Sequence, residues 1–124
     1  MKILHTAFIM CLFVTISCAQ KPMKPKVTFI ELGSVRCIPC QKMQKVIKRL
    51  EETYPKEVET IFYDVWTKEG KKYGDIYDID LIPTQVFLDA DGHEYYRHEG
   101  YFEFDSVRMI LQQKMAVKSL DASK

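Results

Sequence analysis

Hydrophobic residues along the chain recur with two different periods, and each period predicts one kind of element. Continuous runs of β-branched and aromatic residues predict three strands, at 27–32, 58–65 and 84–88. The segment 93–98 is predicted to return as a fourth strand, because Asp91 and Gly92 form a turn that is typical of a hairpin. The chain is therefore expected to build a sheet.

Helical spacing appears between and after these strands. In residues 39–53 the apolar positions follow the spacing i, i+3, i+4 and i+7, and basic residues take the opposite side. The expected buried residues of this helix are Met43, Val46, Ile47 and Leu50. A weaker pattern, interrupted by Gly74, covers 69–77, and a third helix is predicted from Asp105.

The order β-α-β-α-β-β-α predicts an α/β protein with a central, mixed, four-stranded sheet and helices on both faces. Right-handed helical crossovers are expected to make the first three strands parallel, with the hairpin strand antiparallel at an edge. In such sheets, functional residues gather where the parallel strands end. Cys37 and Cys40, which follow the first strand, are therefore expected to lie there.

The amino-terminal segment differs from the rest of the chain. Residues 1–19 combine Lys2 with an apolar run about half as long as a membrane span, which predicts a signal peptide and export to the periplasm. A second reading makes Cys18 a lipidated first residue that anchors the protein to the membrane, and a third leaves the segment uncleaved. Residues 20–26 are predicted to be a linker, 27–118 the domain and 119–124 a tail.

Size and charge narrow the functional classes. A chain of 124 residues has the length of one domain, and nothing in it indicates an obligate oligomer, so a monomer is expected. The formal net charge is +1, too small to gather phosphate backbones, which argues against nucleic acid as a partner. Because Cys11 and Cys18 belong to the predicted signal segment, the domain keeps only Cys37 and Cys40.

The spacing of these two cysteines favours redox chemistry. A thiol attacks a disulfide only as its thiolate, and the start of a helix stabilises that anion through free N–H groups and the helix dipole. Arg36 adds a nearby cation, and Pro39 suits the first helical turn. Cys37 is predicted to attack the disulfide of a partner protein, and Cys40, one turn further on, to resolve the mixed disulfide.

Other interpretations of the pair remain open. The cysteines could form a structural bridge in a peptide-binding module, or bind metal as in a metallochaperone. Structural zinc needs four ligands, commonly two such pairs, and the chain has one. His93 and His98 are expected to be exposed on opposite faces of the hairpin strand, which does not favour a metal site.

Residues 27–115 resemble thioredoxin. The resemblance rests on a strand followed by CIPC, on LIPTQVFLD at 81–89, on the hairpin with Gly92, and on Gly100 before the last helix. It implies a thioredoxin-like fold whose redox group is the Cys37–Cys40 disulfide, with no further cofactor and no metal.

The resemblance also assigns roles to residues outside the cysteine pair. It implies that the Ile82–Pro83 bond is cis and lies beside Cys37, and that the Ile82 backbone binds an extended substrate segment. Glu31 stands where thioredoxin has a buried carboxylate, which implies a raised pKa and proton exchange with Cys40. An exposed carboxylate on an edge strand is the alternative reading of Glu31.

The sequence also departs from thioredoxin around the cysteines. Arg36 replaces a tryptophan and Ile38-Pro39 replaces Gly-Pro, so the substrate surface, which these residues form with Ile82 and Pro83, is expected to differ. Trp66 is expected to be a packing or loop residue. A reductase that receives electrons from a membrane protein is the favoured direction, and an oxidant that introduces disulfides is the open alternative.

Overall fold

The structure is a computed structural model that describes residues 24–121. The predicted signal peptide, with Cys18, and most of the predicted linker lie outside the described residues. No helix within 24–121 combines the length and the apolar character that crossing a membrane requires.

The order of elements is the predicted β-α-β-α-β-β-α. The strands are β1 (Val27–Gly33), β2 (Val58–Asp64), β3 (Thr84–Asp89) and β4 (Glu94–Glu99). The helices are α1 (Ile38–Thr53), α2 (Lys71–Ile76) and α3 (Phe104–Asp121). Helix α3 thus continues three residues past the predicted end of the domain at Lys118.

The four strands form one mixed sheet in the order β2-β1-β3-β4. Strand β1 pairs with β2 in parallel, while β3 is antiparallel to β1 and β4 is antiparallel to β3. The prediction of an antiparallel edge strand is confirmed for β4. The prediction that the first three strands are all parallel is wrong, because β3 runs the other way.

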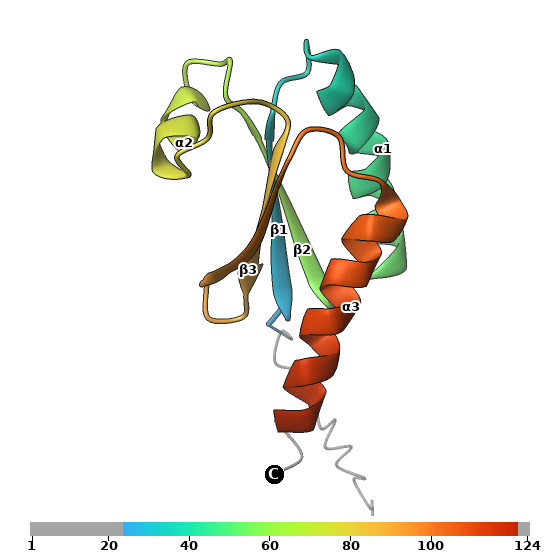
Figure 1. Ribbon diagram of the computed structural model, residues 1–124. Helices are drawn as coiled ribbons and strands as arrows, with labels where there is room; N and C mark the ends of the chain where they lie inside the picture. Colours follow the sequence, from blue (N-terminus) through green and yellow to red (C-terminus); the bar gives the residue numbers. More distant parts are fainter. Residues whose placement is uncertain (1–23, 122–124) are drawn as a thin grey trace, which may run out of the picture.

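The connection from β2 to β3, residues 65–83, stays at one end of the sheet (Figure 1). A parallel connection must carry the chain back along the whole strand, which is about 23 Å for seven residues. The six residues of α2 rise only about 9 Å, which is less than this return requires. Strand β3 therefore begins where β1 and β2 end, and the loops of all three strands meet there (Figure 1).

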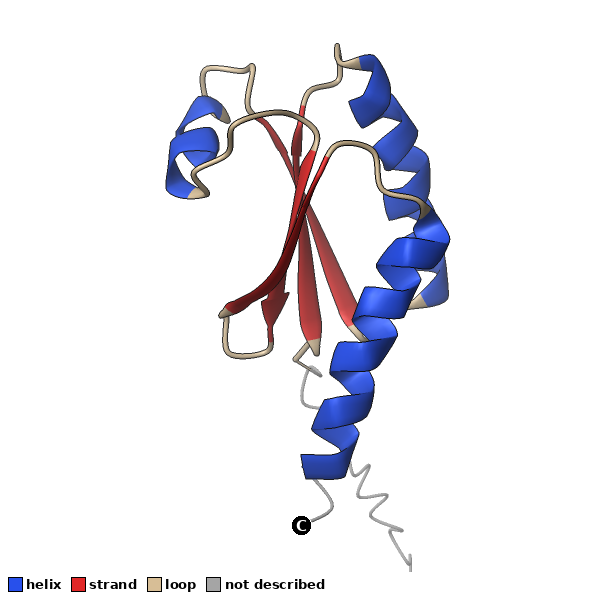
Figure 2. Cartoon of the chain, viewed as in Figure 1, coloured by secondary structure: helices blue, strands red, loops and turns tan. Residues whose placement is uncertain are grey.

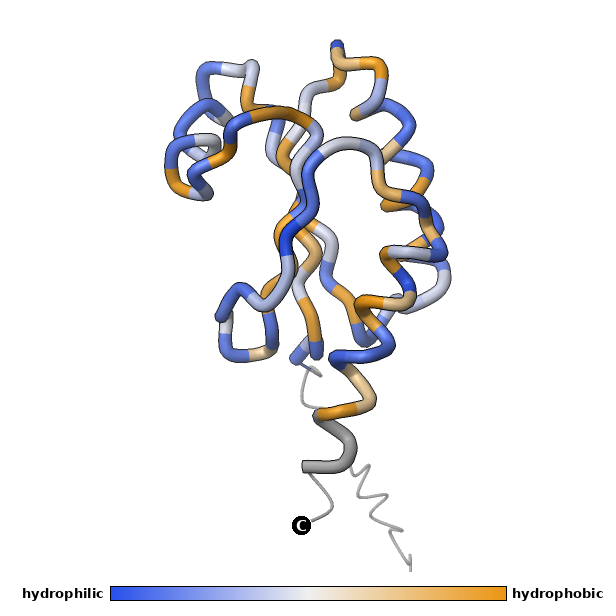
Figure 3. The backbone as a smooth tube through the Cα atoms, viewed as in Figure 1, coloured by the Kyte–Doolittle hydropathy of each residue, from blue (hydrophilic) through white to orange (hydrophobic). Residues whose placement is uncertain are grey.

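Helices cover both faces of the sheet, as predicted. Helices α1 and α3 lie on one face and the short α2 lies on the other (Figure 2). Alternate residues of β1 serve the two sides: Phe29 belongs to the core beneath α1 and α3, and Ile30 to the smaller core beside α2. Coloured by hydropathy, the helices and the strands both mix hydrophobic and hydrophilic positions along their length (Figure 3).

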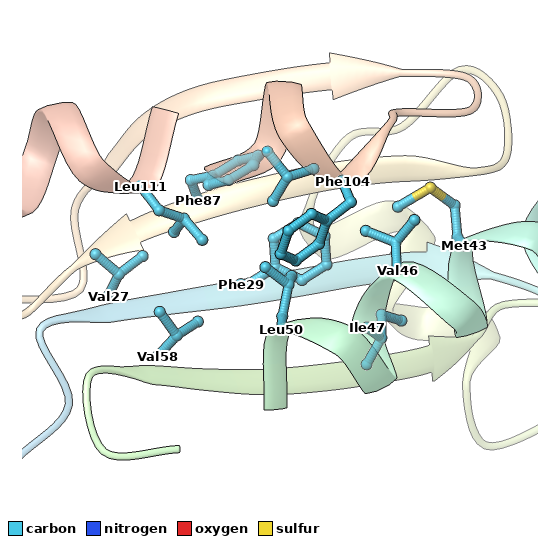
Figure 4. Close-up of a cluster of buried hydrophobic side chains, with 11 residues drawn as sticks. Val27, Phe29, Met43, Val46, Ile47, Leu50, Val58, Phe87, Phe104 and Leu111 are labelled. Carbon is cyan, nitrogen blue, oxygen red and sulfur yellow. The ribbon is translucent and has the colours of Figure 1, made fainter. Parts of the chain in front are cut away.

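The larger core forms between the sheet and the apolar side of α1 (Figure 4). The four helix residues that the spacing predicts to be buried are buried: Met43, Val46, Ile47 and Leu50. Phe29 of β1 and Phe87 of β3 meet edge to face, with ring centroids 5.1 Å apart. This packing fixes the start of α1 against the end of β1, where the cysteines lie.

Candidate active site

The two cysteines lie at the start of α1 and form a disulfide. Their Cα atoms are 5.2 Å apart. Cys37 is the N-cap residue of α1, and its Sγ accepts a hydrogen bond from the backbone N–H of Cys40 at 3.4 Å. Cys37 keeps 8% of its surface exposed and Cys40 keeps none. The structure therefore places Cys37 outermost and Cys40 one turn inward, the arrangement that the spacing predicts.

The surroundings of Cys37 suit an anion once the disulfide is reduced. The sulfur occupies the N-terminus of a helix of 16 residues, where the dipole is positive, and the first turn holds no acidic residue. Pro39 suits this turn because proline has no backbone N–H that would need a hydrogen-bond partner at its position. A thiolate at Cys37 is therefore better stabilised than a thiol in an unstructured chain.

Arg36 pairs with an aromatic ring from a different loop. Its guanidinium carbon lies 5.7 Å from the ring centroid of Trp66, which follows β2 and is 53% exposed. The prediction that Trp66 is a packing or loop residue is confirmed, because it lies in the turn after β2. An indole thus stands beside the cysteine loop, although it comes from a distant part of the sequence.

Asp64, at the end of β2, joins the two loops that carry Arg36 and Trp66. Its Oδ2 accepts from the N–H of Val35 at 3.1 Å, and its Oδ1 accepts from the N–H of Trp66 at 3.0 Å. Partial burial acts to raise the pKa of Asp64, but these hydrogen bonds, helped by Ser34 and Arg36, outweigh it and lower the pKa. Sequence analysis missed this residue, although an aspartate directly after an apolar strand was a visible signal.

We expect Asp64→Ala to lower the free energy of unfolding by about 1 to 2 kcal/mol, because two backbone N–H groups lose their acceptor. Since the folded-state pKa is lowered, the stabilisation is present above the ordinary pKa of aspartate and is lost as the pH falls through the folded value. The difference between variant and wild type should therefore shrink in acid. Urea unfolding measures it, with the exposed Asp80→Ala as control; an equal loss in both variants would contradict the role of Asp64.

Glu31 lies on the central strand β1 and is fully buried. The alternative of an exposed carboxylate on an edge strand is therefore wrong. Burial raises the pKa of Glu31 to about 8, and the hydrogen bond from Gln85 Nε2 offsets part of that rise. Its other oxygen, Oε1, is buried with no hydrogen-bond partner among the described residues.

Gly33 lets Glu31 and Cys40 approach each other. A Cβ atom at Gly33 would lie 3.2 Å from Cys40 Sγ and 3.4 Å from Glu31 Oε1. The sulfur and the unpaired oxygen therefore border the same small space, which a side chain at Gly33 would fill. The carboxyl group and the inner sulfur are thus close neighbours.

The segment before β3 completes the site. The Ile82–Pro83 bond is cis, and Pro83 is buried while Ile82 is half-buried. Because Leu32 pairs with Thr84, the preceding Pro83 comes level with Gly33, next to the cysteine loop. The Pro83 carbonyl accepts from the N–H of Gly100 at 2.7 Å, which ties the segment to the loop after β4. Ile38 and Pro39 are exposed on the same end of the sheet.

The two histidines of the hairpin differ from each other. His93 precedes β4 and is exposed, as predicted. The prediction is wrong for His98, which is partly buried because its ring stacks on Phe102, with centroids 3.9 Å apart. Its Nδ1 lies 2.9 Å from Gln85 Oε1. Within residues 24–121, no three His, Cys, Asp or Glu side chains are grouped as metal ligands.

Comparison with known proteins agrees with this architecture. Residues 12–114 match the family model described as a thioredoxin-like domain, which covers most of the chain. The chain therefore belongs to the thioredoxin-like family. A thioredoxin-like fold with a CxxC disulfide at the end of its first strand indicates a thiol-disulfide oxidoreductase. No curated protein matches the chain significantly.

Solved structures of thioredoxins are similar in fold and distant in sequence. Fasciola hepatica thioredoxin has 23% identity and a TM-score of 0.63, covering 73% of this chain and 83% of that one. Oxidised thioredoxin O2 from Arabidopsis thaliana has 19% identity and a TM-score of 0.62, covering 71% of this chain and 74% of that one. Oxidised mitochondrial thioredoxin 3 from Saccharomyces cerevisiae has 21% identity and a TM-score of 0.61, covering 73% of this chain and 81% of that one. At these identities the similarity shows the fold alone.

Proposed function

We propose that the protein is a thiol-disulfide oxidoreductase of the cell envelope that reduces disulfides of partner proteins. The observation that carries the proposal is the asymmetry of the cysteine pair. Cys37 caps α1 at the surface, whereas Cys40 is fully buried beside the carboxyl group of Glu31. One sulfur is thus placed to meet a partner, and the other to complete the reaction from within.

The reaction needs no group beyond the two cysteines and a proton carrier. The Cys37 thiolate attacks one sulfur of a partner disulfide, which forms a mixed disulfide and releases the other partner sulfur as a thiolate. In molecules whose Glu31 is ionised, Cys40 gives its proton to this carboxylate, and the Cys40 thiolate attacks Cys37 Sγ, which releases the second partner thiolate. Two electrons pass to the partner, and the Cys37–Cys40 disulfide is regenerated.

The surface around the disulfide suits an unfolded or extended protein segment. Several large apolar side chains are exposed in the loops and at the start of α1 at this end of the sheet: Val35, Ile38, Trp66, Leu81 and Tyr101. Such a group of exposed apolar residues is typical of an interaction surface. The half-buried Ile82, next to the cis bond, can offer its backbone to the segment. Arg36, Ile38 and Pro39 border it and are proposed to set its specificity.

Location and electron supply follow from the amino-terminal segment. A signal peptide at 1–19, or lipidation at Cys18, would place the domain on the outer side of the membrane, in the periplasm. That compartment supplies few soluble reductants, so a membrane protein is proposed as the electron donor. The protein is proposed to act as a monomer, with disulfide-containing proteins as its substrates.

Insulin reduction in the presence of dithiothreitol tests the proposal. We expect Cys37→Ser to lower the rate more than about 100-fold, to the rate of dithiothreitol alone, because the attacking sulfur is gone. The matched control is Cys11→Ser with Cys18→Ser, which leaves the rate unchanged. A Cys37→Ser protein that still reduces insulin would contradict the proposal, and would favour a peptide-binding module with a structural disulfide.

A further inference from the structure

Three polar side chains form a row across the sheet, from beneath the cysteines to the edge. Glu31 of β1 lies opposite Gln85 of β3, and Gln85 lies opposite His98 of β4. Gln85 Nε2 donates to Glu31 Oε2 at 3.0 Å, and His98 Nδ1 lies 2.9 Å from Gln85 Oε1. The row lies on the face of α1 and α3, because Phe87, two residues after Gln85, belongs to that core.

The direction of the hydrogen bonds in this row is fixed at Gln85. Its Nε2 also donates to the carbonyl oxygen of Gly100 at 3.2 Å, and a carbonyl can only accept. The amide nitrogen must therefore face Glu31 and Gly100, which turns Oε1 toward His98. It follows that His98 carries a hydrogen on Nδ1 and donates it to Gln85.

This direction determines which oxygen of Glu31 is free. Oε2 is occupied by Gln85, while Oε1 is the buried oxygen that borders Cys40 Sγ across the space at Gly33. When Glu31 is ionised, Oε1 is therefore the oxygen that is free to accept a proton. The row thus directs the proton-accepting oxygen of Glu31 toward the inner sulfur.

His98 is itself held in place from outside the row. Its ring lies nearly parallel to that of Phe102, at an angle of 7°, and the Phe102 N–H donates to Met43 Sδ of α1 at 3.3 Å. The imidazole therefore has a fixed plane, and its Nδ1 hydrogen a fixed direction.

The groups opposite Glu31 on β2 and β3, Phe62 and Gln85, do not titrate. Cys40 of α1 borders Glu31 across Gly33, and His98 of β4 faces it through Gln85.

We propose that Gln85 and His98 are positioning residues, which hold Glu31 with Oε1 toward Cys40 so that the mixed disulfide is resolved quickly. His98 acts through Gln85, and Gln85 acts through Glu31; neither touches the reacting sulfurs. The inference rests on the proposed function for its kinetic part. Its structural part, the fixed arrangement of Glu31, Gln85 and His98, does not depend on the proposed function and can be tested in the oxidised protein.

Carboxyl NMR of the oxidised protein tests the row without any turnover. We expect His98→Phe, which keeps a ring against Phe102 and removes the Nδ1 donor, to move the titration of Glu31 upward by at least about 0.5 pH unit. His98→Asn should restore the wild-type titration, because Asn Nδ2 occupies the place of Nδ1. His93→Phe, on the same hairpin, is the matched control and should change nothing. An unchanged Glu31 titration in His98→Phe would overturn the proposal.

The wild-type protein supplies a second test that needs no variant. Nitrogen NMR should show neutral His98 with its hydrogen on Nδ1, and a neutral ring with its hydrogen on Nε2 would also overturn the proposal. In stopped-flow reduction, His98→Phe should slow the resolving step at least about threefold at neutral pH and leave the attack by Cys37 unchanged. If the wild type shows no attack at all, the proposed function fails, while the two NMR results still decide the row.

Discussion

Replacing Glu31 with glutamine should make the oxidised protein more stable than wild type in alkaline solution. The carboxyl group of Glu31 is neutral in the folded protein up to about pH 8, because burial raises its pKa, whereas in the unfolded chain it ionises near 4.5. The unfolded wild type therefore gains stability from ionisation between these two pH values, and the folded state does not. Glutamine cannot ionise in either state.

The size of the effect follows from the pKa difference. At about 1.4 kcal/mol for each pKa unit, a rise from 4.5 to about 8 corresponds to about 5 kcal/mol. Below pH 4.5 both states of the wild type are protonated and the cost is absent. The free energy of unfolding of Glu31→Gln, relative to wild type, should thus rise by up to about 5 kcal/mol between about pH 4 and pH 9.

Guanidinium unfolding of the oxidised proteins at several pH values measures this rise. Glu99→Gln, which removes an exposed carboxyl group from β4, is the matched control and should follow the wild type at every pH. Parallel curves for Glu31→Gln and wild type would show that Glu31 ionises normally in the folded state. That result would remove it as a proton carrier for Cys40.

Local features of this fold could be predicted from the sequence because short-range spacing determines them. The apolar side of α1 follows from the helical repeat of Met43, Val46, Ile47 and Leu50, and these residues are buried. The position of Cys37 at the start of α1 follows from the strand before it and from Pro39 after it. Both inferences needed no knowledge of distant parts of the chain.

The direction of β3 could not be predicted in the same way. It depends on how far the connection after β2 travels, and the helical pattern there was weak and interrupted by Gly74. Only the observed antiparallel pairing of β1 with β3 shows that the connection does not cross the sheet. The short helix was expected at 69–77, and the wrong step was the assumption that it formed a parallel crossover.

The polar contacts of the site depend on pairing between distant segments. Gln85 and His98 meet Glu31 only through the register of β1, β3 and β4, which the sequence does not specify. One signal was available: Gln85 is a polar residue two positions before Phe87 in an apolar strand, hence on the same face. A polar side chain at such a position requires a partner, and the sequence offered no means of naming it.

Replacing Cys40 with serine should trap partner proteins on Cys37. In the wild type the resolving sulfur lies one helical turn from Cys37, so its effective concentration is far above that of any thiol in solution. Without it, a mixed disulfide waits for an external thiol. We expect its lifetime to increase at least about 1000-fold. Adducts should accumulate on non-reducing gels after incubation with periplasmic proteins, and disappear on addition of dithiothreitol.

The reciprocal variant gives the sharper comparison. Cys37→Ser keeps Cys40, a thiol with no exposed surface, which a folded or extended partner cannot reach. It should therefore form no adducts, and neither should the double variant. Equal trapping by Cys37→Ser and Cys40→Ser would show that either sulfur can attack. The division of labour between an outer nucleophile and an inner resolving thiol would then be wrong, because burial of Cys40 would not restrict its access to partners.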